Sequence, residues 1–174
     1  MIGTLLACLS AALVACSSPS FFPPAITADV KANRDFGVMM AKPDAFKGSA
    51  VQVAGRIVGV QAMDDETLII AQRLPVQHYP AYGPVDTRMH GGQFAVLYPG
   101  KLDPAALWIG NKFIVAADML GAKSVDWEGV SRPEPYLVAR CMHVWKTGQY
   151  YEISDFPYVT DGFYPLEEQT YCAA

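Results

Sequence analysis

Residues 51–60 read VQVAGRIVGV, and this stretch decides the fold that the sequence predicts. Val51, Val53 and Ile57 alternate with polar or small residues, which is the period-two pattern of a β-strand that buries one face. The alternation slips near Gly59, and a slip at a glycine indicates a β-bulge. Because a bulge bends a strand, the stretch favours a small barrel over a flat sheet.

The rest of the predicted sheet follows this strand. Four further strands are predicted, at residues 67–74, 93–98, 112–119 and 136–145. Between the third and the fourth, Asp103 can cap a single helical turn that begins at Pro104. Five strands with a helical turn in this place have the element order of an OB-fold, a partly open barrel. We therefore predict a mainly β, five-stranded OB-like barrel domain over residues 27–145.

A short helix is expected at the start of this domain. Thr27 is a residue type that caps helices, and the helix is predicted over residues 27–41. It ends there because Pro43 pushes the residue before it out of the helical region.

The N-terminus has the pattern of an export signal. Residues 1–15 carry no charge and include an apolar run, which is typical of a signal peptide and too short for a retained membrane helix. The run ends in LVAC at residues 13–16, which looks like a bacterial lipobox. We therefore predict cleavage before Cys16, a diacylglycerol and an N-acyl chain on Cys16, and a lipidated tether over residues 16–26. Several acyl chains on one residue make a stable anchor.

Composition and cysteine content limit the remaining possibilities. Hydrophobic residues make up 52% and charged residues 17% of the chain, which is typical of a globular protein. The net charge is -4 and the 13 basic residues are scattered, so a nucleic-acid partner is not expected. Cys141 and Cys172 are an even pair in an oxidising compartment and are candidates for a disulfide. Alternatively, Cys141 is a buried small side chain and Cys172 is free near a frayed end.

Two segments are candidates for binding. The long loop 74–92 contains Tyr79, Tyr82, Arg88 and His90, which would suit a glycan or peptidoglycan fragment at the mouth of the barrel. Alternatively, the loop only covers an open edge of the barrel.

The second candidate is the aromatic-rich C-terminal tail, residues 146–174. It is expected either to dock another envelope protein or to wrap its own barrel.

Metal and hydrolase chemistry have weaker support. Three histidines and two methionines could suggest a copper site, but only Cys141 and His143 have a close ligand spacing, which would place them on one face of a strand. These two residues could also be read as a nucleophile and a base, but no third group orients them. We therefore predict no catalytic residue, no metal site and no enzymatic activity.

Short motifs in a consistent order resemble the Slp family of outer-membrane lipoproteins, the starvation-inducible type. The resemblance covers roughly residues 35–145 and implies an outer-membrane, periplasm-facing lipoprotein linked to stress or stationary phase, with no catalytic residues to carry over. The resembling residues are Cys16, Phe46-Lys47-Gly48, Val53-Ala54-Gly55-Arg56-Ile57, Leu74-Pro75, Gly92-Gln93-Phe94, Leu102-Asp103-Pro104, Gly110-Asn111-Lys112-Phe113, Tyr136 and Trp145.

Overall fold

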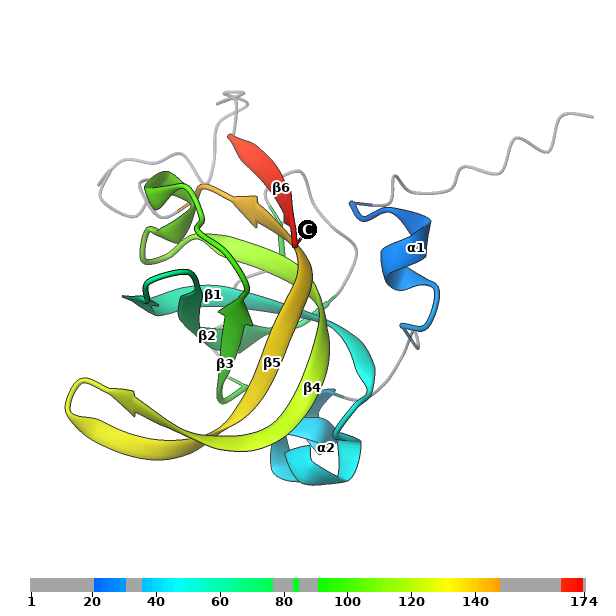
Figure 1. Ribbon diagram of the computed structural model, residues 1–174, viewed down its shortest axis with the longest axis vertical. Helices are drawn as coiled ribbons and strands as arrows, with labels where there is room; N and C mark the ends of the chain where they lie inside the picture. The colour runs from blue at the N-terminus through cyan, green and yellow to red at the C-terminus, as the bar shows by residue number, and fades with distance from the viewer. Residues whose placement is uncertain (1–20, 31–35, 77–82, 85–90, 148–166, 174) are drawn as a thin grey trace, which may run out of the picture.

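Six strands form one sheet that curves into a ring (Figure 1). The computed structural model describes residues 21–30, 36–76, 83–84, 91–147 and 167–173. The strands are β1 (Ala50–Ala62), β2 (Thr67–Leu74), β3 (Gln93–Tyr98), β4 (Lys112–Trp127), β5 (Val130–Trp145) and β6 (Glu168–Cys172). Their order is β3-β2-β1-β4-β5-β6 with antiparallel neighbours, and a parallel pairing of β3 with β5 closes the ring.

The predicted mainly β fold is confirmed, together with its OB-like order of elements. β2 and β3 have the predicted bounds, and the helical turn η2 (Pro104–Leu107) lies between β3 and β4. Its cap is also as predicted, since the Asp103 carboxylate accepts a hydrogen bond of 3.0 Å from the Ala105 backbone N–H. The register of β1 against β2 shifts between Ile57 and Gly59, which confirms the predicted bulge.

The predicted strand number was wrong, because β6 is a sixth strand within the predicted tail. β6 pairs with residues 141–145 of β5, on the edge that β3 pairs with at residues 136–138. β6 therefore extends the sheet where β3 has diverged. Most of its residues are exposed, so it lacks the apolar alternation from which strands are predicted.

β4 and β5 are both longer than predicted, and their additional residues form a hairpin arm outside the ring (Figure 1). Val125 packs in a cluster with Leu68, Ile70 and Ala95 on the outer face of β2 and β3. Trp127 lies so close to Gly59 that a Cβ at Gly59 would overlap its ring. The bulge glycine therefore has a second role, since it makes room for the arm.

The hydrophobic core fills the ring. Its largest fully buried members include Phe94, Phe113, Ile57, Ile69 and Met142. The helical segments α2 (Phe36–Ala41) and η1 (Pro43–Phe46) follow one another before β1. α2 contributes Phe36 and Met39 to the core and lies below the sheet in Figure 1.

The helix predicted over residues 27–41 was wrong over residues 28–30, which form a turn and an irregular residue. α1 (Pro24–Thr27) ends where that helix was expected to begin, and residues 31–35 lie outside the described part of the chain. Pro24 at the first helical position starts α1 earlier than a threonine cap would. α2 ends at Ala41, before Pro43, as predicted. No helix in the described ranges has the length and apolar character needed to span a bilayer.

Candidate functional site

The N-terminal strap, residues 21–29, packs on the outer face of β4 and β5. Phe22 is 3% exposed and lies in a cluster with Ile114, Ala116, Cys141 and Trp145. Phe21 and Ile26 pack against the same cluster. Residues 21–26, the end of the predicted tether, are therefore part of the folded domain, because their apolar side chains cover an apolar patch of the sheet.

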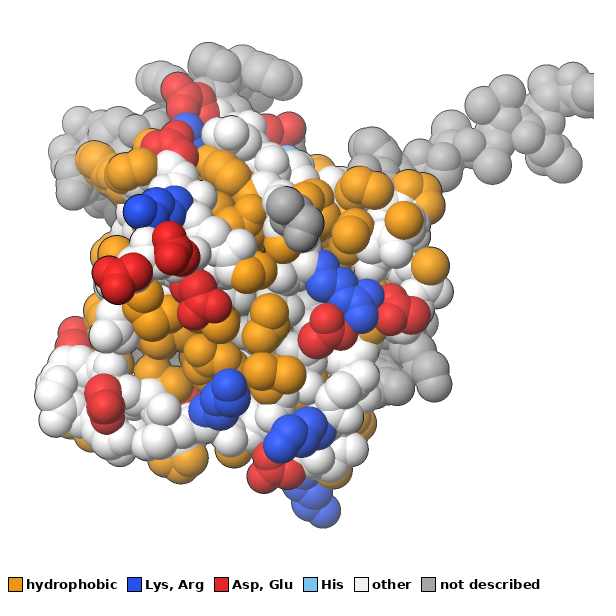
Figure 2. All heavy atoms as spheres, in the orientation of Figure 1, with side chains coloured by type: hydrophobic (Ala, Val, Ile, Leu, Met, Phe, Trp, Pro, Cys, Tyr) orange, Lys and Arg blue, Asp and Glu red, His pale blue; other side chains and the backbone are white. Residues whose placement is uncertain are grey.

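Two ring contacts hold the beginning of the strap. The Phe21 ring lies 4.3 Å from the His143 ring and 5.2 Å from the Trp145 ring, measured between centroids. The His143 and Trp145 rings are themselves 4.4 Å apart in an edge arrangement. Figure 2 shows hydrophobic side chains gathered over the α1 region. The beginning of the strap is thus fixed on the sheet at the end of β5.

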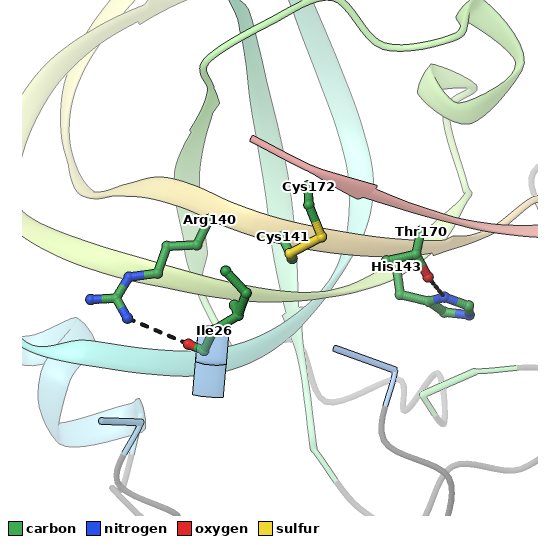
Figure 3. Close-up of a disulfide and its surroundings, with 6 residues drawn as sticks. All are labelled: Ile26, Arg140, Cys141, His143, Thr170 and Cys172. Carbon is green, nitrogen blue, oxygen red and sulfur yellow. Dashed lines mark hydrogen bonds between the residues drawn. A yellow bond between two sulfur atoms is a disulfide. The ribbon is translucent and has the colours of Figure 1, made fainter. Parts of the chain in front are cut away.

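Arg140 joins the strap to the sheet. It donates five hydrogen bonds, which is the full number that a guanidinium can donate. Two go to the Asp118 carboxylate at 2.6 and 2.9 Å, two to the Asp29 carboxylate at 2.6 and 3.0 Å, and one to the Ile26 carbonyl at 3.4 Å. Figure 3 shows the bond between Arg140 and Ile26.

The electrostatics of this group follow from its geometry. The hydrogen bond from Arg140 holds the pKa of Asp29 below its ordinary value, and the hydrogen bonds to Asp29 and Asp118 raise the pKa of Arg140. Asp29 and Arg140 are therefore both charged at neutral pH. This cluster was not predicted, and its one signal in the sequence is Asp118, which interrupts the apolar run 113–120 of β4.

Arg140→Met is expected to loosen the strap and leave the ring intact. The apolar side chain keeps much of the packing volume but leaves both carboxylates without their cation. We expect faster hydrogen exchange at the amides of Ile26 and Val30, with a small change in overall stability because these pairs are partly exposed.

Arg132→Met is the matched control, since Arg132 is exposed on the hairpin arm. Unchanged exchange in the strap of the Arg140 variant would contradict the assigned role.

A disulfide lies beside the strap. Cys141 and Cys172 face each other in the β5–β6 register, with a Cα–Cα distance of 4.0 Å and bonded sulfurs (Figure 3). Cys141 is fully buried beneath the strap. A cysteine in a disulfide has no thiolate, so this arrangement does not provide the nucleophile that a Cys141–His143 hydrolase would need.

His143 is buried between the strap and β6. Its Nδ1 lies 2.8 Å from the Thr170 hydroxyl oxygen (Figure 3). Its Nε2 lies 3.6 Å from a Glu168 carboxylate oxygen, beyond hydrogen-bonding distance. Burial lowers the pKa of His143, and the Glu168 carboxylate opposes that shift only in part. His143 is therefore neutral at neutral pH and serves as a packing group beside Phe21 and Trp145. No group of three or more metal-binding side chains occurs among the described residues.

The predicted ligand-binding residues Tyr79, Tyr82, Arg88 and His90 lie outside the described residues, as does Cys16. Of the predicted loop, residues 74–76, 83–84 and 91–92 are described, and residues 83 and 84 in its middle are both buried. One of them, Gly83, approaches Trp145, since a Cβ at Gly83 would lie 2.8 Å from the indole. The glycan-binding alternative therefore stays a prediction.

A small cavity lies between the hairpin arm and the outer face of β2 and β3. Its volume is about 10 Å³, which is room for roughly one water and far below the size of a ligand pocket. It is lined by Ile70, Gln93, Val125, Trp127, Val130, Arg132 and Glu134. The arm thus fills the face on which an OB-fold usually binds its ligands.

Comparison with known proteins gives one family. A family model described as the outer membrane lipoprotein Slp family matches residues 13–171. No curated protein and no solved structure matches the chain. The match begins within the predicted lipobox and ends in β6, so it includes the strap and most of β6.

Proposed function

The chain belongs to the outer membrane lipoprotein Slp family, and from this premise we propose that acyl chains on Cys16 fasten it to the outer membrane, with the folded domain in the periplasm. In this proposal the protein is a non-enzymatic structural or binding module of the envelope. Its link to stress or stationary phase rests on the family resemblance alone.

The observation that best supports this proposal is the fixed strap. Phe21 follows Cys16 by five residues. Five residues of extended chain span at most about 18 Å. Because Phe21 and Phe22 are packed on the domain, a lipid on Cys16 would hold the domain close to the bilayer and on one side. A strap of this kind suits a module that works at the membrane surface.

The non-enzymatic part of the proposal is supported by the chemistry of the site. The side chains that meet there are the Cys141–Cys172 disulfide, the Arg140 guanidinium with all of its N–H groups hydrogen-bonded, and the buried neutral imidazole of His143. Such groups hold elements together, and none of them is placed as a nucleophile or a general base beside a cavity. We therefore assign the site to positioning of the lipid anchor.

Cys16→Ala tests the anchor. We expect the wild-type protein to stay in the membrane pellet after carbonate washing and the variant to leave it, because the variant lacks the sulfur that carries the lipid. Cys8→Ala, within the predicted signal peptide, is the matched control and should stay in the pellet.

A second variant separates lipidation from signal-peptide retention. Here residues 1–16 are replaced by the signal peptide of an ordinary secreted protein, and the domain should appear in the periplasmic fraction. Retention of both variants in washed membranes would refute the proposed anchor.

A further inference from the structure

Two exposed hydrophobic side chains stand next to each other at one point of the surface. Trp108 is 50% exposed and Ile109 is 58% exposed. The other large hydrophobic side chains that are exposed in the described part of the chain are Val38, Met63, Val76 and Val130, and none of these is adjacent to another in sequence. A single exposed hydrophobic side chain is ordinary, whereas Trp108 and Ile109 together expose a continuous apolar surface that could contact another apolar surface.

The turn that carries this pair is fixed by hydrogen bonds. The Gly110 N–H donates to the Ile57 carbonyl at 2.9 Å, and the Asn111 N–H donates to the Trp108 carbonyl at 3.0 Å. The Asn111 side chain is buried and donates to the carbonyls of Ala105 and Ala106 at 2.9 and 3.0 Å. The backbone is therefore held in place while two large apolar side chains face solvent.

The pair lies at the end of the sheet from which the strap departs. The Thr147 hydroxyl donates to the Gly110 carbonyl at 2.9 Å, just after β5 ends. The last residue of β5, Trp145, packs against Phe21 of the strap. The turn that carries Ile109 and the beginning of the strap are thus both attached to the same end of β5.

We infer that Trp108 and Ile109 insert into the interfacial region of the phospholipid leaflet that holds the acyl chains of Cys16. This inference rests on the proposed lipidation of Cys16. The short stretch between Cys16 and Phe21, with its reach of at most about 18 Å, keeps this end of the domain near the bilayer. Tryptophan prefers the membrane interface, because its ring is apolar and its N–H is polar.

The charges near the turn are compatible with such a contact. Lys146 lies 3.0 Å from the Glu167 carboxylate and 3.6 Å from the Asp103 carboxylate, measured from its Nζ. The acidic groups at this end of the sheet are thus partly neutralised by a shared cation. The lipid anchor supplies the attachment, and the inserted pair sets which face of the domain rests on the membrane.

Quenching by brominated lipids tests the contact on the full lipidated protein. The protein is reconstituted into vesicles of phosphatidylethanolamine and phosphatidylglycerol that contain phosphatidylcholine brominated near the interfacial end of its acyl chains. We expect the emission of Trp108 to shift to the blue and to be quenched. In Trp108→Phe the remaining emission, from Trp127 and Trp145, should be unaffected by bromine. Ile109→Ser should reduce the quenching, and Val130→Ser, at the tip of the hairpin arm, should leave it unchanged.

The outcomes separate this inference from the proposed anchor. Flotation of the protein with the vesicles but no quenching of Trp108 would overturn the membrane contact and leave the anchor in place. A blue shift without quenching would also overturn it, because it would show that protein covers the tryptophan. Failure to float, together with a mass that lacks acyl chains, would refute the anchor and the inference with it.

Discussion

Trp145→Ala is expected to lower the free energy of unfolding by about 3–5 kcal/mol, the range for removing a large buried aromatic side chain. Trp145 is 1% exposed and contacts three separate parts of the chain, namely the strap through Phe21, β5 through His143, and the described part of the 74–92 loop through Gly83. Its removal would leave a cavity where these parts of the chain meet. For a domain of this size, the melting temperature should fall by roughly 10 °C.

Trp108→Ala is the matched control, because it removes the same side chain from a half-exposed position. Its effect on stability should stay within about 0.5 kcal/mol. Thermal unfolding of both variants, followed by circular dichroism, measures the difference. Equal losses in the two variants would show that Trp145 does not connect the strap with the sheet in the way described above.

Reduction of the Cys141–Cys172 disulfide is expected to cost about 3–4 kcal/mol of stability, from the chain entropy of a loop of this length. The loss should begin locally, at β6. Residues of β6 are mostly exposed, so this strand is held on β5 mainly by the backbone ladder and the disulfide, with the Thr170–His143 hydrogen bond and the packing of Tyr171 beside them. We therefore expect the amides of Thr170 and Tyr171 to exchange rapidly once the bond is reduced.

Cys172→Ser provides the control for reduction. The variant should be less stable than the oxidised wild type and insensitive to a reducing agent, which excludes general effects of the agent. Urea unfolding of both proteins, with and without the agent, measures the difference. If reduction leaves the unfolding midpoint of the wild type unchanged, the bond does not hold β6 in place.

The sequence predicts the ring well where one face of a strand is buried and the other is not. The alternation in residues 51–60 reflects this burial, and the slip at Gly59 coincides with the bulge of β1. Residues 120–127 of β4 and 130–135 of β5, which form the arm, were not predicted because they lack this alternation of buried and exposed side chains. The arm is held by only a few buried contacts, such as Val125 on Ile70, and prolines at positions 133 and 135 weaken the strand pattern.

The site was harder to predict because it depends on contacts between residues far apart in sequence. Arg140 lies in β5, Asp118 in β4 and Asp29 in the strap, and nothing in their spacing indicates that one guanidinium binds both carboxylates. The strap was missed because a stretch with two phenylalanines and two prolines, residues 21–24, has no periodicity and was read as a tether. Its burial depends on the apolar outer face of β4 and β5, which the sequence alone does not place beside it.

Intact-mass spectrometry of the protein purified from its native membranes tests the central claim most directly. We predict a chain that begins at Cys16 and carries the added mass of a diacylglycerol and an N-acyl chain. A chain that begins at Met1 and carries no acyl mass would contradict the proposed anchor.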